Sequence, residues 1–191
     1  MKRAFPISVL SMALGAGLAA APAAASGPTL FGRPVQRDGF HFQVAFGWGA
    51  GATSNGVFHN MEIGGTFRNG WSMAYNHVFI QSDGFFKPEG APDLIGGHML
   101  AFRFPLVYRD LILRVSVGPG GTHDQSDGIT AHWGVAWLYG VDLHLPAWPT
   151  SGLTAGLVGL HVVTENDGHH AGWALSLRSE EHTSELQSLL I

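Results

Sequence analysis

The sequence predicts an all-β chain that folds as an eight-stranded antiparallel up-and-down transmembrane β-barrel. Residues 132–145, HWGVAWLYGVDLHL, alternate large apolar side chains with small or polar ones, and a period of two indicates a β-strand. This segment is long for a soluble sheet, whereas a tilted strand that crosses a bilayer needs about 9–11 residues. The same alternation recurs along the chain, and after residue 25 no run of about 18 apolar residues offers a membrane-spanning helix.

The first three strands are expected at residues 40–49, 57–67 and 71–79. In each of them aromatic and aliphatic side chains alternate with small or polar ones, and the Gly-, Ser- and Asn-rich segment between the first two is a loop. Arg68-Asn69-Gly70 forms a three-residue hairpin loop in which Gly70 supplies the left-handed conformation. The third strand is followed by a long polar loop at 81–93.

The fourth strand, 98–106, is expected to pair with the third so that their outward faces stay in register. With Trp71 opposite Phe104, the pairs that follow are Met73–Phe102, Tyr75–Leu100 and His77–His98. After a short turn at 107–110, the fifth strand covers 111–118, and residues 119–129 form a second long loop.

The sixth strand is the 132–145 segment, and it ends at two prolines because proline cannot donate to a sheet ladder. The seventh, 153–164, changes its apolar face between Leu157 and Leu160, which predicts a β-bulge near Gly159. The eighth covers 170–177. Connections are short after the second and fourth strands and long after the third and fifth, as periplasmic turns and outer loops should be.

The N-terminus has the pattern of a secretory signal peptide. Lys2 and Arg3 precede an uncharged run at 4–21, and alanines at 23–25 provide a small-residue cleavage site. We therefore assign residues 1–25 to a signal peptide and 26–39 to a short periplasmic lead-in. The chain has no cysteine, so neither a lipid-anchored cysteine nor a disulfide is expected.

The C-terminal segment departs from the rest in composition. RSEEHTSELQS, beginning at Arg178, resembles the translation of a common sequencing-adapter oligonucleotide. The plain alternative is a short polar helix, because residues 180–191 have fair helix propensity. We expect residues 178–191 to be a non-native tail and the last strand to stop after Leu177, which would leave the barrel incompletely closed.

Inward positions carry the candidate site, a polar network in the lumen. An eight-stranded barrel is just wide enough for side chains to fill it, so the inward polar groups should form a buried network in place of an apolar core. Arg103 and Arg114 would be neighbours, and a carboxylate, best Glu62, should lie between them because an unpaired buried charge costs several kcal/mol. The expected network residues are Glu62, Arg103, Arg114, Asp142 and Asn76, together with Gln43, Asn60, Ser116 and His144.

Outward positions carry large aromatic side chains, which a transmembrane barrel presents to lipid. The lipid-facing aromatics we expect are Trp48, Trp71, Tyr75, Phe102, Trp133, Trp137, Tyr139 and Trp173. His77 and His98 also face outward. Outward polar residues cost least near the membrane interface, so we expect this pair at the outer headgroup level.

Metal, cofactor and nucleic-acid functions are not expected. Eleven histidines invite a metal hypothesis, but the spacing of His123, Asp124 and Asp127, or of Asp167, His169 and His170, matches no ligand template. A formal net charge of −4 without a basic block argues against nucleic acid.

A hydrolase hypothesis would combine Ser72 and Glu62 with His77 or His98. The serine and the glutamate are expected on the lumen face and both histidines on the lipid face, so no Ser–His–acid triad forms and we expect no catalysis.

On this pattern, rather than on any fixed motif, the chain resembles the small eight-stranded outer-membrane barrels of the OmpA/OmpX type over residues 40–177. The resemblance implies export to the outer membrane, with membrane lipid and the barrel-assembly machinery as partners. It implies a structural or surface-interaction role. The alternatives are a narrow pore, a lipid-modifying barrel enzyme, and a soluble secreted barrel that binds lipid inside, which would need the opposite polarity, apolar inside and polar outside.

Overall fold

The computed structural model describes residues 28–31, 39–51, 55–67, 70–82, 87, 89–124, 130–146, 151–166 and 168–183. The predicted signal peptide, most of the lead-in and residues 184–191 lie outside this range. Within the described residues, no helix is both long enough and apolar enough to cross a membrane.

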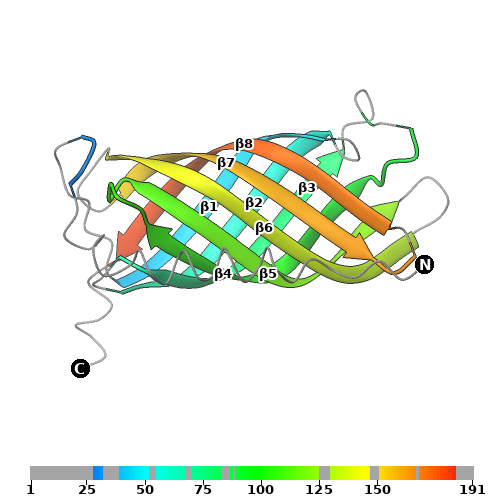
Figure 1. Ribbon diagram of the computed structural model, residues 1–191, viewed down its shortest axis with the longest axis horizontal. Coiled ribbons are helices and arrows are strands. Elements are labelled where there is room, and N and C mark those ends of the chain that lie inside the picture. Colours follow the sequence, from blue (N-terminus) through cyan, green and yellow to red (C-terminus); the bar gives the residue numbers. More distant parts are fainter. Residues whose placement is uncertain are drawn as a thin grey trace.

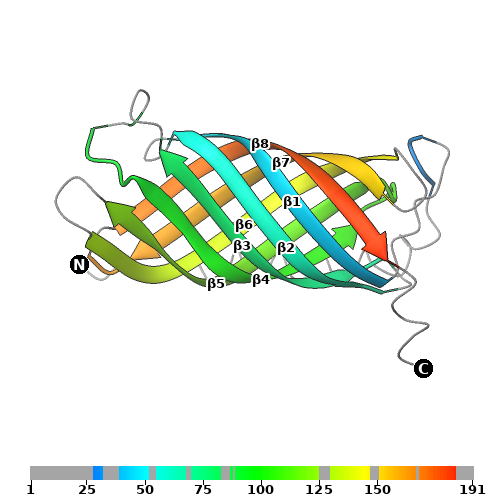
Figure 2. The same cartoon turned by 180° about the vertical axis from the view of Figure 1, so that it is seen from behind.

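Eight antiparallel strands form one closed up-and-down barrel in chain order (Figure 1). The strands are β1 Gly39–Ala50, β2 Gly56–Thr66, β3 Ser72–Ser82, β4 Leu94–Pro105, β5 Leu111–Asp124, β6 Thr130–Pro146, β7 Ser151–Thr164 and β8 Gly168–Thr183. Each strand pairs with its neighbour in sequence, and β1 pairs with β8 to close the wall, which Figure 2 shows from behind. The predicted fold class is confirmed.

The two ends of the barrel differ in their connections. We call the end with the β2–β3, β4–β5 and β6–β7 connections the turn end, and the other the loop end. At the turn end the predicted hairpin is confirmed: Phe67 N donates to Trp71 O at 2.7 Å, and Gly70 has a φ of +84°. The predicted β3–β4 register is confirmed as well, with His77 opposite His98.

Two predicted irregularities of the wall are wrong. Residues 119–124 are not loop, because β5 continues to Asp124 and β6 begins at Thr130. Pro119 has no amide hydrogen to donate to a neighbouring strand. It is tolerated because the β4–β5 pairing is interrupted at this residue, between the pairs Gly97–Gly120 and Leu100–Val117. The bulge near Gly159 is also absent, since the β6–β7 and β7–β8 registers run past this residue without a skip.

The eighth strand is longer than predicted. The prediction that it stops at Leu177 is wrong, because β8 reaches Thr183 and pairs with both β7 and β1. The alternation of faces continues past Leu177, with Arg178 buried toward the lumen and Ser179 exposed. Barrel closure is therefore complete. The adapter origin of residues 178–191 is a separate question and stays a prediction.

Two layers fill most of the lumen, and buried Thr122, Thr164 and His170 lie beyond them at the loop-end rim. At the loop end the inward side chains form an apolar cluster, here called the apolar plug: Ala45, Phe58, Val78, Ile80, Ile95, Met99, Ala136, Leu138, Val158, Leu160, Val162 and Ala174. Toward the turn end they are polar. The expectation of a polar network in place of an apolar core is thus wrong for the loop end, because inward apolar residues such as Leu160 and Val162 meet there.

The closing seam generates the first prediction. Six of the eleven β1–β8 residue pairs, from Phe40–Thr183 to Ala45–Arg178, use residues after Leu177. A chain that ends at Leu177 should therefore fail to close, because the released edge of β1 keeps its backbone groups unpaired in an apolar medium. After refolding in detergent, unheated samples should lack the compact fast-migrating band on SDS gels.

The matched control is a chain that ends at Thr183, which keeps all eleven pairs and should give the compact band. Equal folding of the two truncated chains would show that the pairs after Leu177 do not close the barrel.

Candidate functional site

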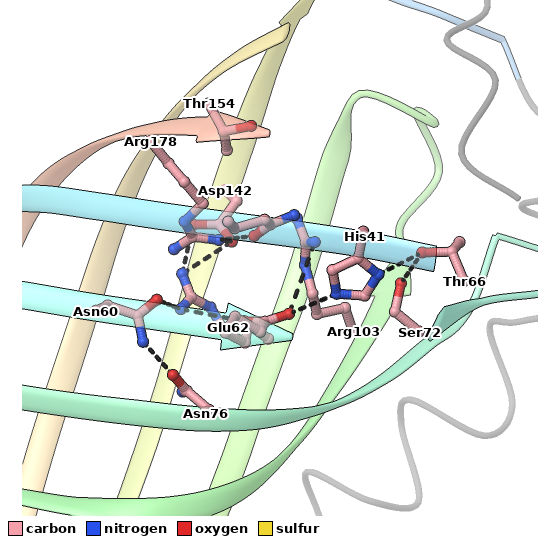
Figure 3. A network of polar contacts seen from close by, with 12 residues as sticks. His41, Asn60, Glu62, Thr66, Ser72, Asn76, Arg103, Asp142, Thr154 and Arg178 are labelled. Atoms are coloured by element: carbon pink, nitrogen blue, oxygen red, sulfur yellow. Dashed lines mark hydrogen bonds and ion pairs between the residues drawn. The ribbon is translucent and has the colours of Figure 1, made fainter. Parts of the chain in front are cut away.

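Glu62 is the centre of the polar layer, drawn in Figure 3. Its carboxylate lies on β2 between two guanidinium groups, with Oε1 3.8 Å from Arg103 Nη1 and Oε2 3.8 Å from Arg114 Nη1. The two arginines face each other across β4 and β5, so one carboxylate between them relieves their repulsion. All three side chains are at most 2% exposed.

Asp142 on β6 is the second carboxylate of the layer. Its Oδ2 lies 3.1 Å from Arg114 Nη2 and 3.0 Å from Arg178 Nη1, so it joins two guanidinium groups. Arg178 also donates to Gln43 Oε1 at 3.1 Å, which connects β8 to β1 at the seam. The layer therefore contains three arginines and two carboxylates, all buried.

Asparagine and serine extend the layer away from the charges. Arg114 Nη1 donates to Asn60 Oδ1 at 3.0 Å, and Asn60 Nδ2 donates to Asn76 Oδ1. Asn76 in turn donates to Ser116 Oγ at 3.2 Å. Each predicted network residue is thus buried in the lumen, with His144 bonded to Thr154 at 3.2 Å near the turn end.

Two members of the network were missed. Arg178 was set aside with the tail, although it occupies the inward parity of β8 after Gly172, Ala174 and Ser176. His41 shares the inward face of β1 with Gln43 and was not among the expected network residues. Its Nε2 lies 3.3 Å from Glu62 Oε1, and its Nδ1 lies 3.1 Å from Thr66 Oγ1. The alternation of faces was the available signal for both.

His41 completes an acid–imidazole–hydroxyl chain. Glu62, His41 and Thr66 follow one another, and Thr66 Oγ1 lies 2.8 Å from Ser72 Oγ. These are the group types of a nucleophilic triad. Both hydroxyls are at most 6% exposed, and neither Thr66 nor Ser72 lines the groove beside Gly47 or the groove beside Gly96 in the outer wall. The arrangement fits a buried structural network better than a site that admits substrate.

The predicted aromatics all lie on the outer wall, where several are strongly exposed: Trp133 is 72%, Trp173 48% and Trp48 45% exposed. Outward histidines stack among aromatic rings. His77 and His98 have centroids 4.6 Å apart with planes at 6°, and Tyr75 Oη is hydrogen-bonded to His98 Nδ1. Mutual bonding and stacking lower the cost of these polar groups on an apolar wall.

A second cluster on the far wall has the same character. His161 stacks on Trp137 with ring centroids 5.1 Å apart. Its Nε2 is hydrogen-bonded to Tyr139 Oη at 3.2 Å, and its Nδ1 is hydrogen-bonded to His169 Nε2 at 3.0 Å. His77 is the central residue of β3, so the first cluster lies below the loop-end rim. The level of His77 and His98 relative to lipid headgroups stays a prediction.

The described residues give no support to the metal hypothesis. Among the described residues, no three His, Asp, Glu or Cys side chains come together as a metal site. Asp127 and Asp167, which belong to the two loop groups considered from sequence, lie outside the described residues. The absence of a metal or cofactor therefore stays a prediction.

The loop-end rim carries a mixed-charge contact. Lys87 Nζ donates to Asp93 Oδ1 at 2.6 Å and lies 3.7 Å from Asp124 Oδ1 at the end of β5. The hydrogen bond to Asp93 raises the pKa of Lys87 above its usual value, against a smaller opposing effect of burial. Lys87 thus keeps its charge and ties the β3–β4 connection to the β5–β6 hairpin.

Comparison with known proteins identifies the fold and no closer relation. No protein-family model matches the sequence, and no curated protein matches it. Among solved structures, the chain is similar to Neisserial surface protein A (NspA), with a TM-score of 0.53 and 15% identity over 78% of this chain and 99% of that chain.

Two further matches have lower TM-scores. They are the N-terminal β-barrel domain of Pseudomonas aeruginosa OprF (TM-score 0.48, 13% identity, 76% and 98% of the two chains) and the Yersinia pestis outer membrane protein Ail (0.47, 14%, 75% and 99%). At 15% identity, the similarity to NspA shows the barrel fold alone.

Proposed function

We propose that the chain is an exported outer-membrane barrel with a closed lumen and a structural or surface-interaction role, and that it has neither conductance nor catalytic activity. The observation that carries this proposal is the distribution of polarity. Charged groups are buried in the lumen, and large apolar side chains cover the outer wall. A bilayer is the solvent in which this arrangement is stable.

The outer wall supports the membrane location. Exposed large apolar residues occur on seven of the eight strands, all but β5, among them Phe46 at 58%, Met73 at 47%, Leu157 at 50% and Leu175 at 69% exposure. A soluble protein rarely exposes a continuous apolar surface of this extent. The polarity is therefore the reverse of what a soluble lipid-binding barrel needs.

The filled lumen argues against the pore. Ions would have to pass the charged layer and then the apolar plug, in which Phe58, Ile80 and Leu138 are fully buried. An eight-stranded barrel leaves little space beyond its own side chains, and an apolar constriction resists hydration.

Catalysis is the weaker alternative because the candidate groups are not placed for it. The histidines that face lipid pair with tyrosine, with one another and with aromatic rings. The lumen chain through His41 has its hydroxyls buried. Export through the predicted signal peptide and insertion by the barrel-assembly machinery belong to the same proposal, as do outer-membrane lipids as partners.

Conductance is the direct test of the proposed function. The folded protein in planar bilayers should carry no steady ion current, because the apolar plug leaves no hydrated path. Integration is established first, by recovery of the protein in the membrane pellet after an alkaline wash. Recovery in the soluble fraction without detergent would contradict the membrane location, and a steady current would favour the narrow pore.

The charged layer makes a prediction about stability. Glu62→Ala should lower the free energy of unfolding in detergent by about 3 kcal/mol, because Arg103 and Arg114 would lose the carboxylate between them in a buried site. Glu62→Gln keeps the size and the hydrogen-bonding group but removes the charge, so it should also be clearly destabilised. Denaturant unfolding followed by tryptophan fluorescence measures both.

The matched control is Asp93→Ala, which breaks the partly exposed contact with Lys87 at the rim. Exposed ion pairs contribute under about 1 kcal/mol, so this variant should stay close to the parent. An unchanged stability for Glu62→Ala would remove the argument that the layer holds the barrel together.

A further inference from the structure

A groove of about 290 Å³ lies in the outer wall near the loop end, across β3 to β6. Its floor is a pair of glycines, Gly96 on β4 and Gly121 on β5, which face each other across the two strands. The neighbouring strands place Phe79 beside Gly96 and Trp133 beside Gly121. From β3 to β6, the outward residues of this row are therefore an aromatic residue, two glycines and a second aromatic residue: Phe79, Gly96, Gly121 and Trp133.

This row makes a slot with aromatic sides. With strands about 4.8 Å apart, the backbones at Phe79 and Trp133 are separated by roughly 14 Å, with no outward side chain between them. The glycines are required there: a Cβ on Gly96 would lie 2.7 Å from Phe79 Cβ, and one on Gly121 would lie 2.4 Å from His132 O. Leu94 and His123 form the upper end of the slot, and His98 the lower end.

We propose that the slot holds an acyl chain of a zwitterionic phospholipid, a proposal that rests on the membrane location proposed above. The slot opens on the outer wall, so in a bilayer its occupant is lipid rather than water. Its volume is at the low end of small-molecule sites, which suits a segment of one chain rather than a whole lipid.

The rim above the slot indicates the headgroup. Lys87 lies between Asp93 and Asp124, and Asp124 follows His123 at the upper end of the slot. Among the described residues, the rim thus presents one lysine and two carboxylates within 4 Å, and no further lysine or arginine that would select an anionic lipid. A headgroup with a phosphate and an amine complements it.

The test is photo-crosslinking in vesicles of phosphatidylethanolamine that contain a phosphatidylethanolamine probe with a diazirine on its acyl chain. After irradiation, mass spectrometry of the digested protein locates the labelled residues. Labelling should concentrate at Phe79, Leu94–His98 and Trp133, at about five times or more the yield at Leu175, although Leu175 is 69% exposed on the far wall. Labelling in proportion to exposure around the whole wall would overturn the proposal.

Variants test the side wall of the slot. Trp133→Ala should lower labelling at Leu94–His98 by about fivefold, because one face of the slot is lost. Trp173→Ala removes an exposed tryptophan that does not line the groove, and should leave that labelling unchanged. Equal labelling at Leu94–His98 in both variants would overturn the proposal.

Each sample is first checked for the compact band of the folded barrel, and if Trp133→Ala does not fold, the map of the parent protein decides alone. Failure of the parent to stay in the membrane pellet after an alkaline wash would overturn both this inference and the proposed function. Retention in the pellet with uniform labelling would overturn this inference only.

Discussion

The burial of three guanidinium groups inside a narrow barrel is the constraint on which the rest of the structure depends. Arg103, Arg114 and Arg178 come from three different strands, and each lies within 4 Å of a carboxylate. Desolvating a charge costs several kcal/mol unless it is compensated, so Glu62 and Asp142 must stand between the arginines. The layer therefore ties strands that are not neighbours across the lumen, β2 to β4 and β5, and β6 to β8, and it adds a contact between β8 and β1 at the seam.

This constraint accounts for the two-layer lumen. The charged groups lie toward the turn end, where His41, Thr66 and Ser72 continue the hydrogen bonds. The apolar plug fills the lumen on their loop-end side, and the buried polar residues Thr122, Thr164 and His170 lie beyond it. The apolar plug separates the charges from the loop end. Both layers are packed by side chains, and in the proposed function the lumen provides stability while interactions with other molecules take place on the outer wall or at the loops.

Alternation of faces allowed most of this structure to be predicted from the sequence. It predicted the strands, the hairpin at Gly70, the β3–β4 register and the inward placement of Glu62 and Arg103. It did not predict the apolar plug, because inward apolar residues such as Leu160 were interpreted as a change of face at a bulge. Which inward side chains come together in the plug depends on how the strands are staggered in the closed barrel.

The other errors came from local composition. Pro119 and the surrounding glycines suggested a loop, yet pairing resumes on both sides of the proline in β5. Arg178 and the polar residues after it suggested a tail, yet β8 continues and Arg178 supplies a third guanidinium group to the lumen. In a barrel with a polar lumen, a charged residue at an inward position is compatible with a strand, and composition alone misses this.

The closed, dry lumen is the central claim, and cysteine accessibility measures it most directly because the chain has no cysteine of its own. Ser116→Cys places a thiol in the buried polar layer, and Val107→Cys places one on the turn-end connection, where Val107 is 76% exposed. With a membrane-impermeant thiosulfonate reagent, folded Val107→Cys should react at once, and folded Ser116→Cys should stay unmodified until it is unfolded by heat. Reaction of the folded Ser116→Cys protein at the rate of Val107→Cys would show an open, hydrated lumen and would contradict the account.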